Sequence, residues 1–352
     1  MKKIVSIILL VVNSTLIGKV SQAQDIHFSQ FYENAILRNP ALTGIFSGDY
    51  KAGINYRNQW SSISVPFQTG LASVESRIAV SEIDFLSFGV TATYDHAGSI
   101  NFNSLQVYPA INYNKSLEDD RQSYLSAGFT AGYVQRSVDP NKMKFASQYG
   151  IGGYNANNAS GETINNVKLS YLDIGAGISF NSSMGRENTV NYYLGAAAYH
   201  VNKPKAAFNP SENFIRMDTK WNGNFGFQWA IDPKLALTFH SNYSKQGAYQ
   251  EIIFGALGSW REYDAAMKTM FVLYGGLFYR VNDAIIPTLK LDYQRYSITV
   301  SYDINSSGLR TASSGVGGFE LSLFTRGDLT TGFWAVDKNK CPRFENMLMP
   351  TM

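Results

Sequence analysis

The sequence has few of the features that hold small exported proteins together or that mark an enzyme. It contains one cysteine, Cys341, so no disulfide can form within the chain. Charged residues make up only 16% of the 352 residues. No G-x-S-x-G, P-loop or H-E-x-x-H motif is present, and the four histidines are scattered without metal-ligand spacing. We therefore expect no cofactor, no metal site and no catalytic activity.

The first residues have the pattern of a secretory leader. Lys2 and Lys3 precede an apolar run over residues 4–12, and Ser21-Gln22-Ala23 offers the small residues that a signal peptidase reads. The run is shorter than the roughly 20 residues needed to span a bilayer. We expect residues 1–23 to be a cleaved signal peptide.

The whole sequence has a formal net charge of +3, and removing this leader brings it to zero. The leader holds three lysines and no acidic residue, so the 30 basic residues fall to 27, which equals the 27 acidic ones. A chain without net charge lacks the electrostatic footprint of a nucleic-acid-binding protein. No later segment is long enough for a transmembrane helix, whereas 22 Tyr, 22 Phe and 30 Gly are present. For an exported chain this composition favours a transmembrane β-barrel, because only helices and closed barrels satisfy every backbone polar group in lipid.

Strand-like alternation recurs from residue 49 to residue 326. In the clearest segment, residues 296–304, Tyr and Ile or Val occupy every second position and Ser, Thr and Asp the others. One face suits lipid and the other a wet lumen. The predicted strands are 49–57, 67–77, 85–95, 102–114, 123–136, 167–180, 190–201, 221–231, 234–243, 248–258, 269–281, 285–292, 295–304 and 316–326. The sequence thus predicts an all-β fold, a transmembrane antiparallel up-and-down β-barrel of about 14 strands and of the outer-membrane type.

The expected organisation follows from an even strand count. Residues 24–48 would be an N-terminal periplasmic segment, 49–326 the barrel and 327–352 a C-terminal periplasmic tail, with the long connections outside the cell. The link at 259–268 is too long for the periplasmic side, which suggests a miscount of one hairpin there. A soluble β-sandwich is the rival fold, but its strands are usually shorter and its outer faces carry more charge.

Two long connections are the candidate partner-binding loops. Residues 137–166 contain Phe145, Tyr149 and Tyr154, and residues 202–220 contain Phe208 and Phe214. Exposed aromatic residues among small polar ones suit protein recognition. The alternative for such a loop is to fold inward and plug the lumen.

One adjacent acid–histidine pair, Asp95-His96, lies at a predicted strand end. A bare Asp-His dipeptide at such a place is far better explained as a turn than as part of a catalytic site. The other histidines, His27, His200 and His240, are interpreted as lumen or interface residues.

Several short motifs spread over the mature chain resemble those of one known family. The motifs are Phe28-Ser29-Gln30, Asn39-Pro40-Ala41, Gly44, Tyr56-Arg57-Asn58-Gln59-Trp60, Tyr279-Arg280, Asp283-Ala284-Ile285-Ile286-Pro287, Ser301-Tyr302-Asp303-Ile304-Asn305, Gly317-Gly318-Phe319-Glu320 and Cys341-Pro342-Arg343-Phe344. With them the chain resembles the PorP/SprF family, outer-membrane components of the type IX secretion system in gliding and related bacteria. The resemblance implies a cell outer membrane protein without enzymatic activity.

The resemblance also implies partners: other type IX secretion components and adhesin-type cargo with a C-terminal targeting domain, whose export or cell-surface attachment the barrel would assist. An outer-membrane diffusion channel or hydrophobic-solute transporter is the alternative function, because a barrel of this size can enclose a pore.

Four charged residues within these motifs alternate with apolar neighbours on predicted strands. Arg57, Arg280, Asp303 and Glu320 are therefore expected to face the lumen, where opposite charges can pair or simply fill the barrel. The Asn39-Pro40 pair is expected to form a turn as the chain enters the barrel.

Overall fold

The computed structural model describes residues 25–61, 65–81, 83–162, 166–185, 188–208, 215–308 and 310–329. The predicted signal peptide, Phe214, Cys341 and all but the start of the predicted tail lie outside this part of the chain. Among the described residues, no helix is long and apolar enough to cross a membrane.

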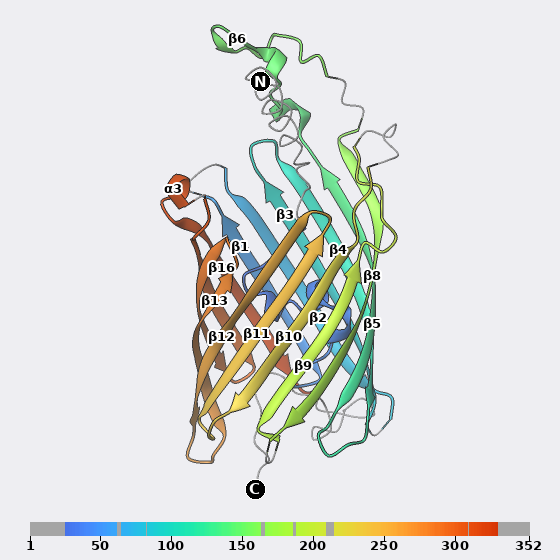
Figure 1. The fold of residues 1–352 in the computed structure, drawn as a ribbon, viewed down its shortest axis with the longest axis vertical. Helices are drawn as coiled ribbons and strands as arrows, with labels where there is room; N and C mark the ends of the chain where they lie inside the picture. Colours follow the sequence, from blue (N-terminus) through green and yellow to red (C-terminus); the bar gives the residue numbers. More distant parts are fainter. Residues whose placement is uncertain are drawn as a thin grey trace, which may run out of the picture.

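Fourteen antiparallel strands close into a barrel in which each strand pairs with its neighbours along the chain and the first pairs with the last (Figure 1). The barrel strands are β1 (Tyr50–Gln59), β2 (Phe67–Ala79), β3 (Phe85–Ala97), β4 (Phe102–Ser116), β5 (Tyr124–Ser137), β8 (Lys168–Met184), β9 (Val190–Tyr199), β10 (Lys220–Ala230), β11 (Leu235–Gln246), β12 (Tyr249–Tyr263), β13 (Thr269–Arg280), β14 (Ala284–Tyr293), β15 (Tyr296–Asn305) and β16 (Val316–Gly327). The predicted barrel and its strand number are confirmed, and the sandwich is excluded.

The miscount suspected at the 259–268 link did not occur, since the barrel has the predicted fourteen strands. Strand β12 continues to Tyr263, past the predicted end at residue 258, because Ser259 and Trp260 keep the alternation of buried and exposed side chains. Only a short turn remains, in which the Asp264 carboxylate accepts hydrogen bonds from the backbone N–H groups of Ala266 and Lys268.

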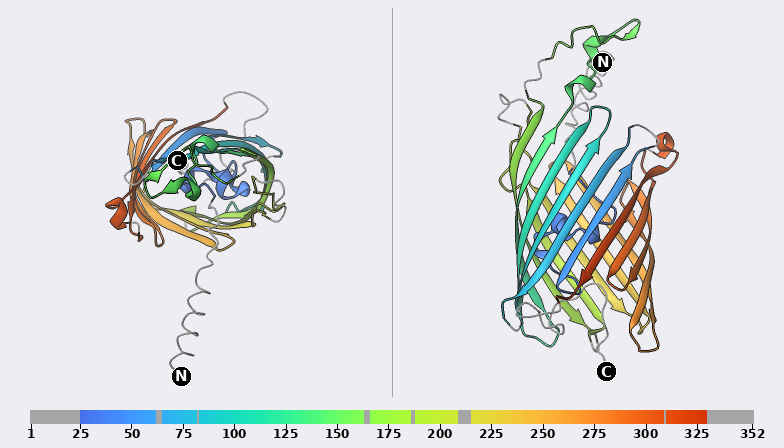
Figure 2. Two further views of the ribbon diagram at one scale, coloured as in Figure 1. Left: turned by 90° about the horizontal axis from the view of Figure 1, so that it is seen from above. Right: turned by 180° about the vertical axis from the view of Figure 1, so that it is seen from behind.

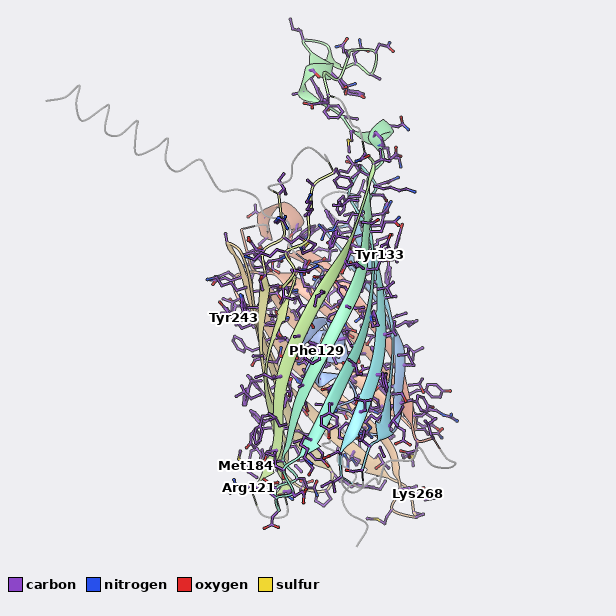
Figure 3. The ribbon with its side chains drawn as sticks, turned by 90° about the vertical axis from the view of Figure 1, so that its right-hand side faces the viewer. Arg121, Phe129, Tyr133, Met184, Tyr243 and Lys268 are labelled. Atoms are coloured by element: carbon purple, nitrogen blue, oxygen red, sulfur yellow. The ribbon has the colours of Figure 1, made fainter. Side chains whose placement is uncertain are left out.

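The two faces of the wall differ as the alternation predicts. Apolar side chains such as Phe129, Tyr133 and Tyr243 point away from the wall (Figure 3), and Phe129 is 60% exposed. Their neighbours Ser126 and Thr130 are buried on the luminal face. Burying the outer side chains in lipid stabilises the barrel by about 25 cal/mol per Å² of apolar surface, so this face suits a bilayer.

One end of the barrel has the longer connections. At this end, chain segments 138–167, 200–219 and 306–315 join β5 to β8, β9 to β10 and β15 to β16 (Figure 1). Within these connections lie η3 (Pro140–Lys142), η4 (Ala146–Gln148), the small hairpin β6 (Tyr149–Gly150) with β7 (Gly153–Tyr154), and α3 (Arg310–Ser313). We call it the loop end. The opposite, turn end holds short turns and the start of β1 beside the end of β16.

Residues 25–48 lie inside the barrel, and we call them the luminal segment (Figure 2). They form η1 (Phe31–Glu33), α2 (Ala35–Arg38) and η2 (Pro40–Leu42). This location differs from the periplasmic segment expected for residues 24–48, and the reason is physical. The segment carries Phe28, Phe31, Tyr32, Ile36 and Leu42, all less than 9% exposed in the lumen, and these side chains would face water outside it.

Candidate functional site

Four charged side chains from four strands meet in the lumen. The Arg57 guanidinium of β1 lies 2.8 Å from the Asp303 carboxylate of β15 and 3.3 Å from the Glu320 carboxylate of β16. Arg280 of β13 lies 2.5 Å from Asp303, and also contacts Asp283. The structure thus brings together all four residues selected from the sequence, and each is at most 4% exposed.

This charged cluster binds the luminal segment through its backbone. The Glu320 carboxylate accepts hydrogen bonds from the N–H groups of Ser29 (2.7 Å) and Gln30 (3.0 Å). The Ser29 hydroxyl donates to Asp303 (2.6 Å) and accepts from Arg57 (2.7 Å). Such charge-assisted hydrogen bonds are roughly twice as strong as neutral ones. The Phe-Ser-Gln motif therefore anchors the luminal segment to the barrel wall.

A second anchor was missed in the sequence. Glu33 of the luminal segment is 1% exposed and lies between two lysines of the wall, 3.1 Å from Lys51 and 2.6 Å from Lys290. Lys51 and Lys290 lie on the polar faces of two strands whose residues alternate between apolar and polar. This alternation was the one sequence signal that could have placed the two lysines in the lumen. The partner, Glu33, could not be recognised because its segment was expected outside the lumen.

The Asn39-Pro40-Ala41 motif does not guide entry into the barrel but packs deep within it. The Asn39 amide group donates to the backbone carbonyl of Ile178 (3.1 Å) and to the Asn224 side chain (3.0 Å). Its carbonyl oxygen accepts from the Ala41 N–H (2.9 Å). A side chain at Gly128 of β5 would overlap the backbone of Pro40 and Ala41. The wall is thus shaped for close approach of the segment at this position.

We expect Gly128→Val to lower the free energy of unfolding by about 1–3 kcal/mol, because the added side chain overpacks the contact with Pro40. Urea unfolding of the detergent-solubilised barrel measures this change. The matched control is Gly223→Val in β10, since a Cβ there meets no atom closer than 4.0 Å. Equal unfolding midpoints for the two variants would contradict the close packing.

A third anchor lies nearer the loop end, just beyond the end of β9. His200 is 1% exposed, with Nε2 2.9 Å from Asp25 and Nδ1 2.9 Å from Asp173. Lys220 lies 3.4 Å from Asp25. Burial alone would lower the pKa of His200, but the two carboxylates raise it to about 9. An imidazolium therefore links the first described residue of the luminal segment to the wall.

This histidine predicts a loss of stability at alkaline pH. The folded-state pKa of about 9 lies above the ordinary value of 6.5, so the stabilisation is complete below about pH 6.5 and disappears as the pH rises through 9. The full effect is about 3 kcal/mol, at 1.36 kcal/mol per pKa unit. Urea midpoints at pH 7 and pH 10 measure it, with His200→Gln as the control. If the wild-type barrel and this variant lost equal stability over that interval, the imidazolium anchor would be refuted.

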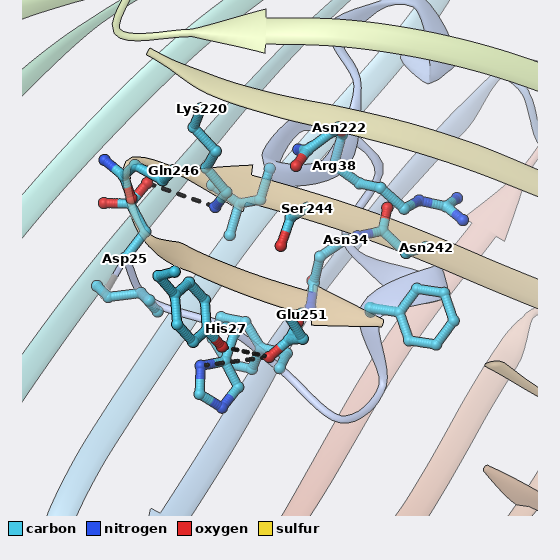
Figure 4. Close-up of a pocket in the computed structure, with 15 residues that line it drawn as sticks. Asp25, His27, Asn34, Arg38, Lys220, Asn222, Asn242, Ser244, Gln246 and Glu251 are labelled. Atoms are coloured by element: carbon cyan, nitrogen blue, oxygen red, sulfur yellow. Dashed lines mark hydrogen bonds and ion pairs between the residues drawn. The ribbon is translucent and has the colours of Figure 1, made fainter. Parts of the chain in front are cut away.

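A cavity of about 60 Å³ remains between the luminal segment and strands β10, β11 and β12 (Figure 4). One water needs about 10–15 Å³ when cavities are measured by a water-sized probe, so the space holds a few water molecules. The polar side chains that line it include Asn34, Arg38, Asn222, Ser244 and Glu251.

The loop candidates fall into two groups. Tyr149 and Tyr154 lie on the β6–β7 hairpin, with ring centroids 5.4 Å apart, and are 54% and 37% exposed. The described part of their connection extends away from the barrel (Figure 1), whereas the luminal segment lies in the interior (Figure 2). Phe145, half-buried, precedes η4, and Phe208 packs on Phe102 at 6.5 Å.

Asp95 and His96 contact different partners at the end of β3. The Asp95 carboxylate accepts a hydrogen bond from Thr69 (2.6 Å), while His96 Nδ1 lies 2.7 Å from the Asn103 side chain. Of the remaining histidines, His240 stacks on Tyr32 at 4.9 Å and His27 lies 3.9 Å from Glu251, both inside the barrel.

Comparison with known proteins adds a family and a fold. Residues 20–324 match the family model described as "Type IX secretion system membrane protein PorP/SprF". No curated protein matches the chain.

Among solved structures, the chain is similar to a TodX monoaromatic hydrocarbon channel mutant, deltaS2S3, with a TM-score of 0.50 and 8% identity over 82% of this chain and 93% of that one. The CymD monoaromatic hydrocarbon channel has a TM-score of 0.48 and 10% identity, over 84% of this chain and 93% of that one. A Pseudomonas aeruginosa FadL homologue has a TM-score of 0.46 and 9% identity, over 82% of this chain and 92% of that one. At these identities the likeness concerns the barrel fold alone.

Proposed function

The chain belongs to the type IX secretion system PorP/SprF family of membrane proteins. We propose that it assists the export or cell-surface attachment of adhesin-type cargo that carries a C-terminal targeting domain. It is an outer-membrane β-barrel of that secretion system. In the proposed role it catalyses no reaction, and its partners are the cargo domain and other components of the secretion machinery.

One observation carries the proposal: the lumen is occupied by the chain's own N-terminal segment. Three anchors, at the buried Ser29 and Glu33 and at the half-buried Asp25, bind this segment to the wall. Because this segment occupies the lumen and the cavity beside it measures about 60 Å³, we assign contact with a protein partner to the rims. The β6–β7 hairpin, with Tyr149 and Tyr154 exposed beyond the loop end, is the surface that we assign to cargo contact.

The proposed orientation places the loop end outside the cell and the turn end in the periplasm. Long extracellular connections and short periplasmic turns are the rule for bacterial outer-membrane barrels. With the signal peptide 1–23 removed, the tail 327–352 then lies in the periplasm, on the side of the inner secretion machinery. The luminal segment runs from Asp25 toward the turn end, where β1 begins.

The same lumen gives no support to the alternative, a diffusion channel or hydrophobic-solute transporter. TodX and CymD are named as monoaromatic hydrocarbon channels, but the chain shares only 8% and 10% identity with them. A cavity of about 60 Å³ is too small to serve as a channel or to take up a hydrophobic solute of ordinary size.

Affinity purification of the tagged barrel from its native cells in mild detergent tests the proposal. We expect a large surface protein with a C-terminal targeting domain to copurify with the wild-type barrel. Replacing residues 149–154 by a Gly-Ser stretch of equal length is expected to abolish most of this recovery, because clustered exposed aromatics dominate protein interfaces. A Gly-Ser replacement of residues 264–268, at the turn end, is the matched control. Recovery of the wild-type barrel without any surface protein would contradict the proposal.

A further inference from the structure

The cavity beside the luminal segment is lined unevenly. Asp25 and Lys220 lie at one end of it, and Arg38 and Asn242 at the other, with Asn34 and Ser244 between them (Figure 4). The acidic residue at the first end has its own cations, since Asp25 contacts both Lys220 and His200. The Arg38 end differs.

Arg38 is a buried cation for which the described part of the chain offers no carboxylate partner. It is 8% exposed and donates one hydrogen bond, from Nη1 to the Tyr193 hydroxyl at 2.6 Å. Its guanidinium otherwise lies over aromatic faces, 5.7 Å from the Phe31 centroid and 5.4 Å from that of Tyr193. Arg57 and Arg280, by contrast, both pair with carboxylates in the lumen. A buried guanidinium has donors for a bidentate anion, so its neighbourhood is where an external one would bind.

The neighbouring amides are also without partners. Asn34 is 5% exposed, and neither its nitrogen nor its oxygen has a hydrogen-bond partner among the described residues. It precedes helix α2 but makes no capping bond with its side chain. The Asn222 oxygen and the Arg38 Nε are likewise unpaired within the described residues. Buried polar groups are hydrogen-bonded in the great majority of cases, so a cluster of unpaired ones around a cavity indicates an occupant.

We propose that this cavity binds a short-chain monocarboxylate. The carboxylate would accept hydrogen bonds from the Arg38 guanidinium and the Asn34 amide. The alkyl part would lie against Phe28, Phe31 and Leu37, which line the same cavity. A single negative charge is favoured over a double one, because Asp25 and Glu251 also line the space and repel a dianion more strongly than a monoanion, and the volume favours a small ligand. The site is independent of the proposed role in cargo attachment.

Isothermal titration of the whole refolded barrel with propionate tests this site. Chloride keeps the ionic strength constant, and propionamide, of equal shape but neutral, is the matched ligand. We expect a saturable one-to-one signal for propionate and at least a tenfold weaker one for propionamide, because hydrogen bonds to a charged group exceed neutral ones by about that factor. Equal affinities for the two compounds, or no signal for either, would show that only water or an unselective additive enters, and would overturn the proposal.

Variants locate the site without endangering the fold. Asn34→Ala removes an amide that has no partner among the described residues, so the barrel should fold normally and bind propionate about tenfold more weakly. Arg38→Lys retains the charge but loses the planar fork, and should also weaken binding. Arg261→Lys, toward the turn end of β12, is the matched control and should bind like the wild type. Unchanged propionate affinity in both Asn34→Ala and Arg38→Lys would also overturn the proposal.

Discussion

Removal of residues 25–47 is expected to convert a closed barrel into an open one. The deletion takes away the luminal helices while leaving β1 and the other thirteen strands intact. A barrel of this size without a plug encloses an aqueous path. Liposomes that contain the deletion variant should therefore swell in small sugars, whereas liposomes with residues 24–352 intact should not.

Two controls make this result interpretable. Heat-modifiable migration on a detergent gel shows whether the deletion variant still forms a barrel. A deletion of residues 141–158, which shortens the chain at the loop end instead, should leave the liposomes impermeable. A folded deletion variant that causes no swelling would show that the luminal segment does not close the barrel.

Arg57→Met is expected to lower the free energy of unfolding by about 3–5 kcal/mol, the usual cost of removing one partner from a buried ion pair. Glu320, 1% exposed, would lose its guanidinium and keep only neutral donors. Asp303 would retain Arg280. Urea unfolding followed by tryptophan fluorescence measures the change.

Arg295→Met is the matched control for this substitution. Arg295 lies over the exposed ring of Tyr296, 5.9 Å from its centroid, so its loss should cost at most about 1 kcal/mol. The double variant Arg57→Met with Glu320→Gln should be more stable than Arg57→Met alone, because the unpaired charge is removed too. Identical unfolding of Arg57→Met and the wild type would mean that the charged cluster does not stabilise the fold.

The wall of the barrel could be predicted from the sequence because its signal is local. In each strand, residues two positions apart share a face, and the contrast between apolar and polar faces is visible within ten residues. Residues 296–304 show it most clearly, and β15 has the predicted extent within one residue. The end of β12 was missed because Gly258 interrupts the apolar face, although Trp260 resumes it.

The interior could not be predicted in the same way because its contacts are long-range. Ser29 and Glu320 are 291 residues apart in sequence, and neither has a local pattern that names the other. Gly128 reads as an ordinary strand glycine until Pro40 lies against it. Lumen-facing positions for Arg57, Arg280, Asp303 and Glu320 followed from alternation, but their contacts with the luminal segment did not. His200 was interpreted only as a lumen or interface residue, since Asp25 and Asp173 are distant in the chain.

Single-channel recording of unmodified residues 24–352 in a planar bilayer tests most directly whether the barrel works through its rims and not through its lumen. The anchors at Ser29, Glu33 and Asp25 predict no steady open level, at most brief low-conductance events. A large, steady open conductance would contradict the closed lumen and favour a channel.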